Sequence, residues 1–229
     1  MLAIGSVIVA GVYFVVQSTT KKTEAGLEET VQQAKEQAAS TPRLTPEEEY
    51  DRGLKALEVG ESGPAYELAA RWFRLAADHG HVPAQFETAR LLWFGLGAPA
   101  DPGAARRYAR EAASKGFPPA VTLAGIWETT AEDGDTEQGL RWLGAAAEDD
   151  DPWAQARLAL IHLEGKLLEA DDLTALYWAE RAHALAPEDA EELRLLAWQR
   201  IPASSRALTV ALLAGQLGRE VVPPVTPGN

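Results

Sequence analysis

The 229-residue chain contains no cysteine, which excludes disulfides, thiolate metal ligands and a cysteine nucleophile. Basic residues are also scarce, because 21 Lys and Arg stand against 34 Asp and Glu, for a formal net charge of −13. Nucleic-acid binding requires clustered basic side chains that neutralise phosphates, so this charge balance argues against that function. The lack of cysteine does not fix the compartment, since cysteine-free proteins occur on both sides of a membrane.

Sequence signatures of catalysis are missing as well. The chain has no G-x-S-x-G nucleophile elbow, no P-loop and no dinucleotide-binding fingerprint. The four histidines, of which His79 and His81 flank a turn glycine, are too scattered to converge on a metal ion. The acidic run 149–151 lacks the spaced oxygens and the glycine of a calcium loop, so solvated charge at a helix end is the better interpretation. We therefore predict a protein that is not an enzyme and that uses no metal or cofactor.

The N-terminus carries a long apolar stretch. The first twenty residues contain no charged side chain, and a helix of this length reaches about 30 Å, enough to cross the hydrocarbon core. No Lys or Arg precedes the stretch and no small-x-small cleavage site follows it, so residues 1–20 are predicted to be an uncleaved single-pass anchor in a bacterial inner membrane. Lys21 and Lys22 follow, so the positive-inside rule favours a cytoplasmic C-terminal region. A periplasmic location stays open, because the bias is only two charges.

Residues 21–45 are predicted to form a helical spacer and a linker. Apolar side chains recur there at alternating spacings of four, three and four, at Leu27, Val31, Ala34 and Ala38. Two heptads with alanine at half of these positions are too short to dimerise alone, so a solvated spacer is favoured over weak self-association through residues 23–40. Thr45 and Glu48 then form a capping box with Pro46 at the first helical position, which marks the start of the globular domain.

Four segments of the chain repeat one pattern about 36 residues apart. An aromatic column contains Trp72, Tyr108, Trp142 and Trp178, and two alanine columns contain Ala76, Ala112, Ala146 and Ala182, then Ala84, Ala120, Ala154 and Ala190. The offsets are 36, 34 and 36 in each column. A fixed period in this range indicates one helical unit stacked on copies of itself. Alanine lets helix backbones approach closely and the aromatic ring fills the gap between them, so these columns are predicted to be structural.

Turn residues divide the rest of the chain into ten helices in five antiparallel pairs. The predicted ranges are 46–59, 64–79, 83–94, 101–115, 119–131, 136–148, 152–164, 172–185, 187–200 and 203–218. No segment alternates with period two over a length that would indicate a sheet. The predicted fold class is all-α, an α/α solenoid over residues 46–220, with the last helix capping the stack. Residues 221–229, which include three prolines, are predicted to be a flexible tail.

Small residues, glycines and one aromatic follow a fixed order within segment 84–120. They are Ala84, Ala89, Gly95, Gly97, Asp101, Tyr108, Ala112, Ala113, Gly116 and Ala120. In this order the segment resembles a Sel-one-like repeat, a relative of the tetratricopeptide repeat. Later copies degrade, since Asp150 and Ala186 stand where Gly80 and Gly116 stand in the earlier ones. The resemblance covers about residues 46–200, and it implies that the first helix of each pair lines a concave groove.

Aromatic residues outside the columns indicate where a partner binds. Around the helix predicted at 83–94, Phe86, Trp93 and Phe94 lie opposite the face that packs between repeats. The same face in the other copies completes the predicted partner-binding groove: Tyr50, Leu54, Leu57, Phe86, Arg90, Trp93, Phe94, Ile126, Trp153, Leu160, Leu163, Leu196 and Arg200. This groove is mainly apolar, with Arg90 as an isolated cation, and we expect its rings to be left uncovered by the chain's own packing.

Such a surface suits an amphipathic helix or an extended peptide, and an exposed apolar patch of this size is otherwise a liability. We predict a membrane-anchored scaffold or adaptor that binds a protein partner, such as a subunit of a bacterial envelope complex. One alternative is a periplasmic module that binds glycan or peptidoglycan through Trp93, Trp127 and Trp153. Another is that the groove is filled by the chain itself, through superhelical closure or through residues 23–40.

Overall fold

The computed structural model describes residues 44–58 and 63–224, and its regular structure in these ranges is entirely helical. The anchor predicted at 1–20, nearly all of the spacer predicted at 21–45 and residues 225–229 of the tail lie outside the described residues. Within the described ranges, no helix combines the length and the apolar character needed to span a membrane. The chain divides into two units, Met1–Leu44 and Thr45–Asn229, and all helices described below belong to the second.

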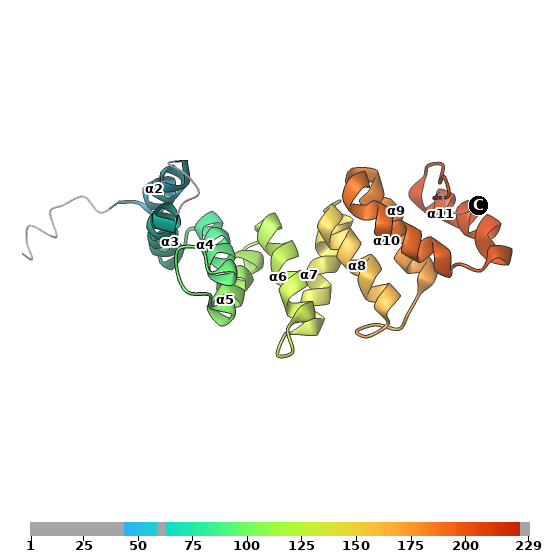
Figure 1. The fold of residues 1–229 in the computed structure, drawn as a ribbon, viewed down its shortest axis with the longest axis horizontal. Helices are drawn as coiled ribbons and strands as arrows, with labels where there is room; N and C mark the ends of the chain where they lie inside the picture. Colours follow the sequence, from blue (N-terminus) through green and yellow to red (C-terminus); the bar gives the residue numbers. More distant parts are fainter. Residues whose placement is uncertain (1–43, 59–62, 225–229) are drawn as a thin grey trace, which may run out of the picture. The chain divides into compact units, whose positions relative to one another are not determined.

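The helices follow one another in chain order (Figure 1). They are α2 (Pro46–Glu58), α3 (Gly63–Asp78), α4 (Val82–Phe94), α5 (Pro102–Ser114), α6 (Pro118–Thr130), α7 (Thr136–Glu148), α8 (Pro152–Glu164), α9 (Asp172–Leu185), α10 (Pro187–Arg200) and α11 (Arg206–Leu217). The first nine of these agree with the predicted ranges to within one residue at either end.

The last predicted helix, 203–218, differs from the structure at its start. The chain first forms a 3₁₀ helix, η1 (Ala203–Ser205), and α11 begins only at Arg206. No side chain caps the beginning of either helix. Since 3₁₀ turns are common where an α-helix starts, η1 is a tighter first turn ahead of α11.

Side-chain caps begin most of the other helices. Asp101, Asp135, Asp151 and Asp171 each accept a hydrogen bond at 2.8 to 3.0 Å from a backbone N–H in the first turn of the following helix. The predicted capping box at the start of α2 is confirmed, because the Thr45 N–H donates to the Glu48 carboxylate and the Glu48 N–H donates to the Thr45 hydroxyl. These contacts satisfy backbone donors that a helix start leaves without a partner.

Each helix pair packs on the next through the alanine columns. Helix α3 contacts α4, α5 contacts α6, and α7 contacts α8. All eight column alanines are buried, and the aromatic column is buried at Tyr108 and half-buried at its three tryptophans. The structural role predicted for these columns is therefore confirmed: they allow the close helix packing that builds the stack.

The one 34-residue offset arises in the turn between α6 and α7. That turn, residues 131–135, is two residues shorter than the connections 95–101 and 165–171 that join α4 to α5 and α8 to α9. Glu128, which is fully buried, organises it by accepting a hydrogen bond from the Asp135 N–H at 2.7 Å. Gly134 passes so close to the Glu128 carbonyl oxygen that a Cβ atom would lie 2.2 Å from it. The short turn therefore depends on one buried carboxylate and one glycine.

Two polar features predicted as solvated surface turns have defined partners. Asp150 adopts the left-handed conformation (φ 61°) that Gly80 and Gly116 adopt at the equivalent turns, and its carboxylate binds Arg181 at 2.7 Å. His79 and His81 pair with Glu49 and Glu47 of α2, each at 2.7 Å. Asp150 and His79 are exposed, as expected of surface turns, and both sets of side chains also connect neighbouring repeats.

Candidate functional site

The first helices of the pairs lie on the tighter side of the stack. Helix α6 contacts α8, and α8 contacts α10, whereas no comparable contact joins α5 to α7 or α7 to α9 within the described part of the chain. Stacked helix pairs curve toward the side on which they approach most closely. The first helices α6, α8 and α10 therefore lie on the inner side of the curve, where the groove was predicted.

One position recurs on the first helices, six residues after the column alanines of α4, α6, α8 and α10 and, in α2, 36 residues before Arg90. It is occupied by Leu54, Arg90, Ile126, Leu160 and Leu196, which we call the first-helix column. All five side chains are half-buried or exposed, and all but Arg90 are apolar. The column thus presents an accessible side chain from α2, α4, α6, α8 and α10 in turn, and every member belongs to the predicted groove.

The aromatic side chains of the predicted groove are only partly accessible. Phe94 and Trp153 are exposed, with 64% and 62% of their surface open to solvent. Trp93 instead stacks on the buried Trp127, with ring centroids 4.2 Å apart and planes at 12°. The expectation of uncovered rings was therefore wrong for Trp93.

Further along the same face, the chain covers two more of the predicted rings. Phe86 meets Phe117 edge-on at 5.6 Å, and Tyr50 lies 5.4 Å from Phe73. Leu57 is half-buried against the core between α2 and α3. The N-terminal half of the predicted groove is thus largely packed by the repeats that form it.

The three tryptophans required by the glycan-binding alternative do not form one open surface. Trp127 is buried beneath Trp93, and Trp153 projects from the first turn of α8. Only Trp153 of the three exposes most of its ring, so stacking of a sugar would rest on a single aromatic side chain.

The predicted isolated cation, Arg90, has partners on its own helix. Its guanidinium binds the Glu87 carboxylate at 2.9 Å and lies 5.8 Å from the centroid of the Phe86 ring. Burial raises the pKa of Glu87, and the charge of Arg90 partly opposes this shift. The prediction of an isolated charge was therefore wrong, and this part of the groove holds a local ion pair.

Two charged residues on the same face were not predicted to belong to the groove. Glu87 and Arg157 occupy the position three residues after a column alanine, where Leu123 and Leu193 stand in other repeats. Burial lowers the pKa of Arg157, whose N–H groups reach the hydroxyl and carbonyl oxygens of Thr129 at 3.4 Å. Charged residues at a position otherwise held by leucine were a signal available in the sequence.

Four residues of the predicted groove converge between α8 and α10. Leu160, Leu163, Leu196 and Arg200 line an open hollow of about 300 Å³, together with Glu164 and Gln199. Arg200 is held in place by Leu163, whose carbonyl oxygen accepts from it at 2.6 Å, and by an ion pair with Asp172 at 2.6 Å. The C-terminal half of the predicted groove is therefore an accessible apolar hollow edged by a fixed guanidinium.

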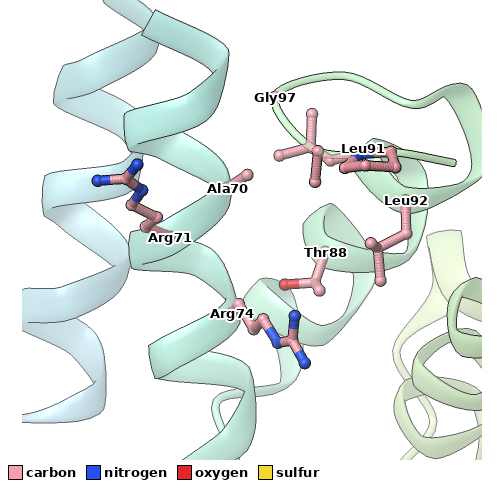
Figure 2. Close-up of a pocket in the computed structure, with 9 residues that line it drawn as sticks. Ala70, Arg71, Arg74, Thr88, Leu91, Leu92 and Gly97 are labelled. Atoms are coloured by element: carbon pink, nitrogen blue, oxygen red, sulfur yellow. The ribbon is translucent and has the colours of Figure 1, made fainter. Parts of the chain in front are cut away.

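A second hollow, of about 240 Å³, lies between α3, α4 and the loop 95–101, outside the predicted groove. Figure 2 shows Arg74 extending from α3 beneath Thr88 of α4, whereas Arg71 extends to the other side of α3. Gly97 brings the loop against α3 with φ 75°, and a Cβ atom there would lie 2.1 Å from the Tyr66 carbonyl oxygen. No pattern in the sequence indicated this hollow. It results from the close approach of the loop 95–101 to α3, which lies well before it in the sequence.

Within residues 44–58 and 63–224, no three His, Asp or Glu side chains come together in a way that could hold a metal ion. The chemistry that this face offers is apolar burial and salt bridging.

Comparison with known proteins places these features among related chains. A sequence model of the Sel1 repeat matches residues 49–81, 82–117, 130–151 and 154–185, which together make up more than half of the chain. The unmatched segment 118–129 is most of α6, the helix that precedes the short turn. An uncharacterized protein of Neisseria meningitidis serogroup B is 37% identical over 120 residues, which cover 52% of this chain and 25% of that protein. The chain thus spans about a quarter of the length of this relative.

Two solved structures share the fold. A protective antigen present in uropathogenic Escherichia coli strains, displaying an SLR fold, has a TM-score of 0.60 at 22% identity, over 82% of this chain and 41% of the antigen. A Sel1 repeat protein from Oxalobacter formigenes has a TM-score of 0.58 at 20% identity, over 73% of this chain and 70% of that protein. At these identities the likeness concerns the fold, and it agrees with the stacked helix pairs described above.

Proposed function

Because this chain belongs to the Sel1 repeat family, whose members generally mediate protein–protein interaction, we propose that it is a scaffold that holds a segment of a partner protein on the first-helix column. Members of this family are typically not enzymes. The observation that carries the proposal is the column itself, because leucine or isoleucine remains accessible at one repeat position on four of the five first helices. Repeated exposure of apolar side chains on one face is typical of a binding surface.

The column favours a partner segment with apolar side chains at regular intervals. An amphipathic helix or an extended peptide can place one such side chain against each repeat. Covering an exposed leucine completely contributes about 1.5–3 kcal/mol, and the column leucines are already partly covered, so each contact adds less than that. Several repeats acting together are therefore needed for stable binding.

The hollow between α8 and α10 is the strongest contact in this proposal. Leu160, Leu163 and Leu196 can surround an apolar side chain of the partner, while the fixed guanidinium of Arg200 lies at the edge. A cation at this edge favours a carboxylate next to the apolar side chain of the partner. We expect the partner segment to carry an acidic residue beside its main apolar anchor.

The test compares two pairs of leucines. The variant Leu160→Ser/Leu196→Ser removes the apolar column at α8 and α10, and the control Leu75→Ser/Leu185→Ser alters two exposed leucines elsewhere on the molecule. Cross-linking of the full chain in its native membrane, followed by mass spectrometry, should show a partner with the parent chain. We expect recovery of this partner to fall at least tenfold with the column variant and to stay within twofold with the control.

Circular dichroism and thermal unfolding of both variants check that the helices are intact. An equal loss of the partner from both leucine pairs, or none from the column pair, would exclude the first-helix column as the binding surface.

We propose further that residues 1–20 anchor the chain in a bacterial inner membrane, with the repeats on the cytoplasmic side. The uncharged apolar stretch and the lysines at 21 and 22 support this arrangement. A reporter enzyme fused after Asn229 should be active if it works only in the cytoplasm and inactive if it works only outside it. The reverse result would contradict the sidedness, and release of the chain from membranes by alkaline carbonate would contradict the anchor.

A further inference from the structure

An arginine of the chain lies over three of the four rings in the aromatic column. The guanidinium of Arg52 is 4.9 Å from the centroid of the Trp72 ring, and that of Arg181 is 5.1 Å from Trp178. Tyr108 is covered by its neighbour Arg107 at 5.2 Å. At Trp142 no such cation is found anywhere in the described part of the chain.

Two positions that supply a cation elsewhere do not supply one at Trp142. Arg141 stands where Arg107 stands beside Tyr108, but its guanidinium binds Glu137 at 2.5 Å and Gln138 at 2.7 Å on its own helix. Arg181 stands three residues after Trp178, and the corresponding position after Trp142 is Ala145, which is exposed and too short to reach the ring. The nearby Lys115 is directed elsewhere, because its ammonium group lies 3.4 Å from the Gly80 carbonyl oxygen and 3.2 Å from the Gln85 side-chain oxygen.

A hollow of about 510 Å³ occupies the space beside Trp142. It is lined by Thr122 of α6, by Trp142 and Ala145 of α7, and by the aspartates at 149–151. Thr122 is more than nine-tenths buried, and its hydroxyl oxygen has no hydrogen-bond partner within the described residues. An unsatisfied buried hydroxyl that lines a hollow indicates a missing polar partner.

The three carboxylates at the hollow differ in whether the chain provides them with a partner. Asp150 binds Arg181 at 2.7 Å, and Asp151 caps α8 by accepting from the Ala154 N–H at 2.8 Å. The Asp149 carboxylate makes no hydrogen bond or ion pair with any described residue. One carboxylate thus faces the hollow without a partner, next to an aromatic ring with no cation above it.

The hollow also has few groups that could bind an anion, because the helix N-termini near it offer few free N–H groups. Helix α6 begins with Pro118 and Pro119, which lack N–H groups, and α8 begins with Pro152 and is capped by Asp151. Few backbone donors are left to bind an anion there. The groups that face the hollow are therefore an aromatic face, a carboxylate and a hydroxyl.

We propose that this hollow binds an arginine side chain of a partner protein, with the guanidinium face on Trp142 and its N–H groups directed to Asp149 and Thr122. The chain already contains such an arrangement, since Arg181 lies over Trp178 and binds both Asp150 and Glu148. Arginine suits the site better than lysine, because its planar group stacks on the ring while its edge donates to carboxylate. The site rests on the proposed scaffold function and adds a contact on α7, away from the first-helix column.

The test uses two short peptides and the full chain in mild detergent. The probes are the acetylated, amidated peptide Gly-Gly-Arg-Gly-Gly and the same peptide with citrulline, which keeps the shape of arginine and lacks its charge. Saturation-transfer NMR titrations give their dissociation constants. We expect the arginine peptide to bind at least fivefold more tightly than the citrulline peptide.

Three variants locate the site. Ala145→Arg supplies the missing cation from the chain and should abolish the preference for arginine, while the matched control Ala211→Arg, on an exposed position of α11, should keep it. Asp149→Asn should weaken binding of the arginine peptide two- to fivefold. Equal affinity of the parent chain for both peptides, or an unchanged preference in Ala145→Arg or in Asp149→Asn, would overturn the proposal.

The variant Leu160→Ser/Leu196→Ser should keep the full preference, because the first-helix column does not contribute to this hollow. The leucine variant therefore tests partner binding by the first-helix column, and the peptide titrations test the arginine site independently of it.

Discussion

At the scale of single residues, Glu128 shows how one buried side chain can replace part of a repeat pattern. Its carboxylate accepts from Arg110 Nε at 2.8 Å, from Arg110 Nη2 at 2.5 Å and from the Asp135 N–H at 2.7 Å. The guanidinium of Arg106 lies 3.5 Å away. This cluster connects α5, α6 and the short turn before α7, so the carboxylate holds together the one repeat that is two residues shorter than the others.

We predict that Glu128→Gln lowers the free energy of unfolding by about 1–3 kcal/mol, because it removes the buried acceptor of Arg110 and the Asp135 N–H, while Arg110 is 42% exposed and Arg106 keeps its pair with Asp133. The control Glu137→Gln removes an exposed carboxylate paired with Arg141 and should cost less than about 0.5 kcal/mol. Urea unfolding at pH 7 measures both values. Similar losses in the two variants would show that the Glu128 cluster contributes no more than a surface pair.

The ionisation of Glu128 predicts that the free energy of unfolding depends on pH. Burial raises the pKa of Glu128, but the hydrogen bonds from Arg110 and from the Asp135 N–H, with the charge of Arg106, outweigh it, so the pKa lies below its ordinary value. A lowered pKa in the folded state means that this stabilisation is complete above the pKa of the unfolded chain and is lost as the pH falls through the folded value. The difference in unfolding free energy between the parent chain and Glu128→Gln should therefore shrink as the pH falls below about 4.3.

At the scale of the helix, α11 closes the C-terminal end of the stack. Leu213 is fully buried in the cluster that contains Leu176 and Trp198, whereas its neighbour Leu212 is 46% exposed. Arg219, just after α11, donates to the Glu180 carbonyl oxygen at 2.8 Å and so fastens the following segment to α9. A helix with one buried face and one solvated face is the usual end of a solenoid.

We predict that Leu213→Ala lowers the free energy of unfolding by about 2–5 kcal/mol, because it opens a cavity against α9 and α10. The adjacent substitution Leu212→Ala should change it by no more than about 0.5 kcal/mol. Thermal unfolding followed by circular dichroism distinguishes the two. If Leu212→Ala proves the more harmful change, α11 does not cap the stack through the face described here.

At the scale of the whole molecule, the described helices contact only their near neighbours in the chain. Each helix from α2 to α9 packs on the next one, the main contacts at longer range join α6 to α8 and α8 to α10, and α11 packs on α9. Such a stack behaves as a linear series of units whose stabilities depend on adjacent interfaces. The central pairs have a neighbour on both sides, and the end pairs have one.

We predict that backbone amides of α6 and α7 exchange with solvent at least tenfold more slowly than those of α2, because the terminal helix can open without disturbing the remainder. Hydrogen exchange followed by mass spectrometry of the full chain measures this gradient. Uniform protection from α2 to α10 would indicate that the stack opens as a single cooperative unit.

Part of the candidate site follows from the repeat pattern of the sequence. The pattern places every member of the first-helix column, because period and helical geometry are enough to put side chains on one face. It did not predict that Trp93 is covered by Trp127, which lies 34 residues further along the chain. Nor did it indicate the hollow at Trp142, where Arg141 pairs with Glu137 instead of covering the ring and Ala145 stands in place of the arginine that follows Trp178.

The sequence alone determined the helices and the order in which they stack. Capping side chains, prolines and alanine columns act over a few residues or one repeat, so their consequences can be derived from spacing. Only the tertiary structure decided which aromatic rings are covered, which arginine meets which carboxylate and where space is left between repeats. These outcomes depend on distances of a few ångströms between side chains of different helices, and a repeating pattern fixes which helices are neighbours without fixing those distances.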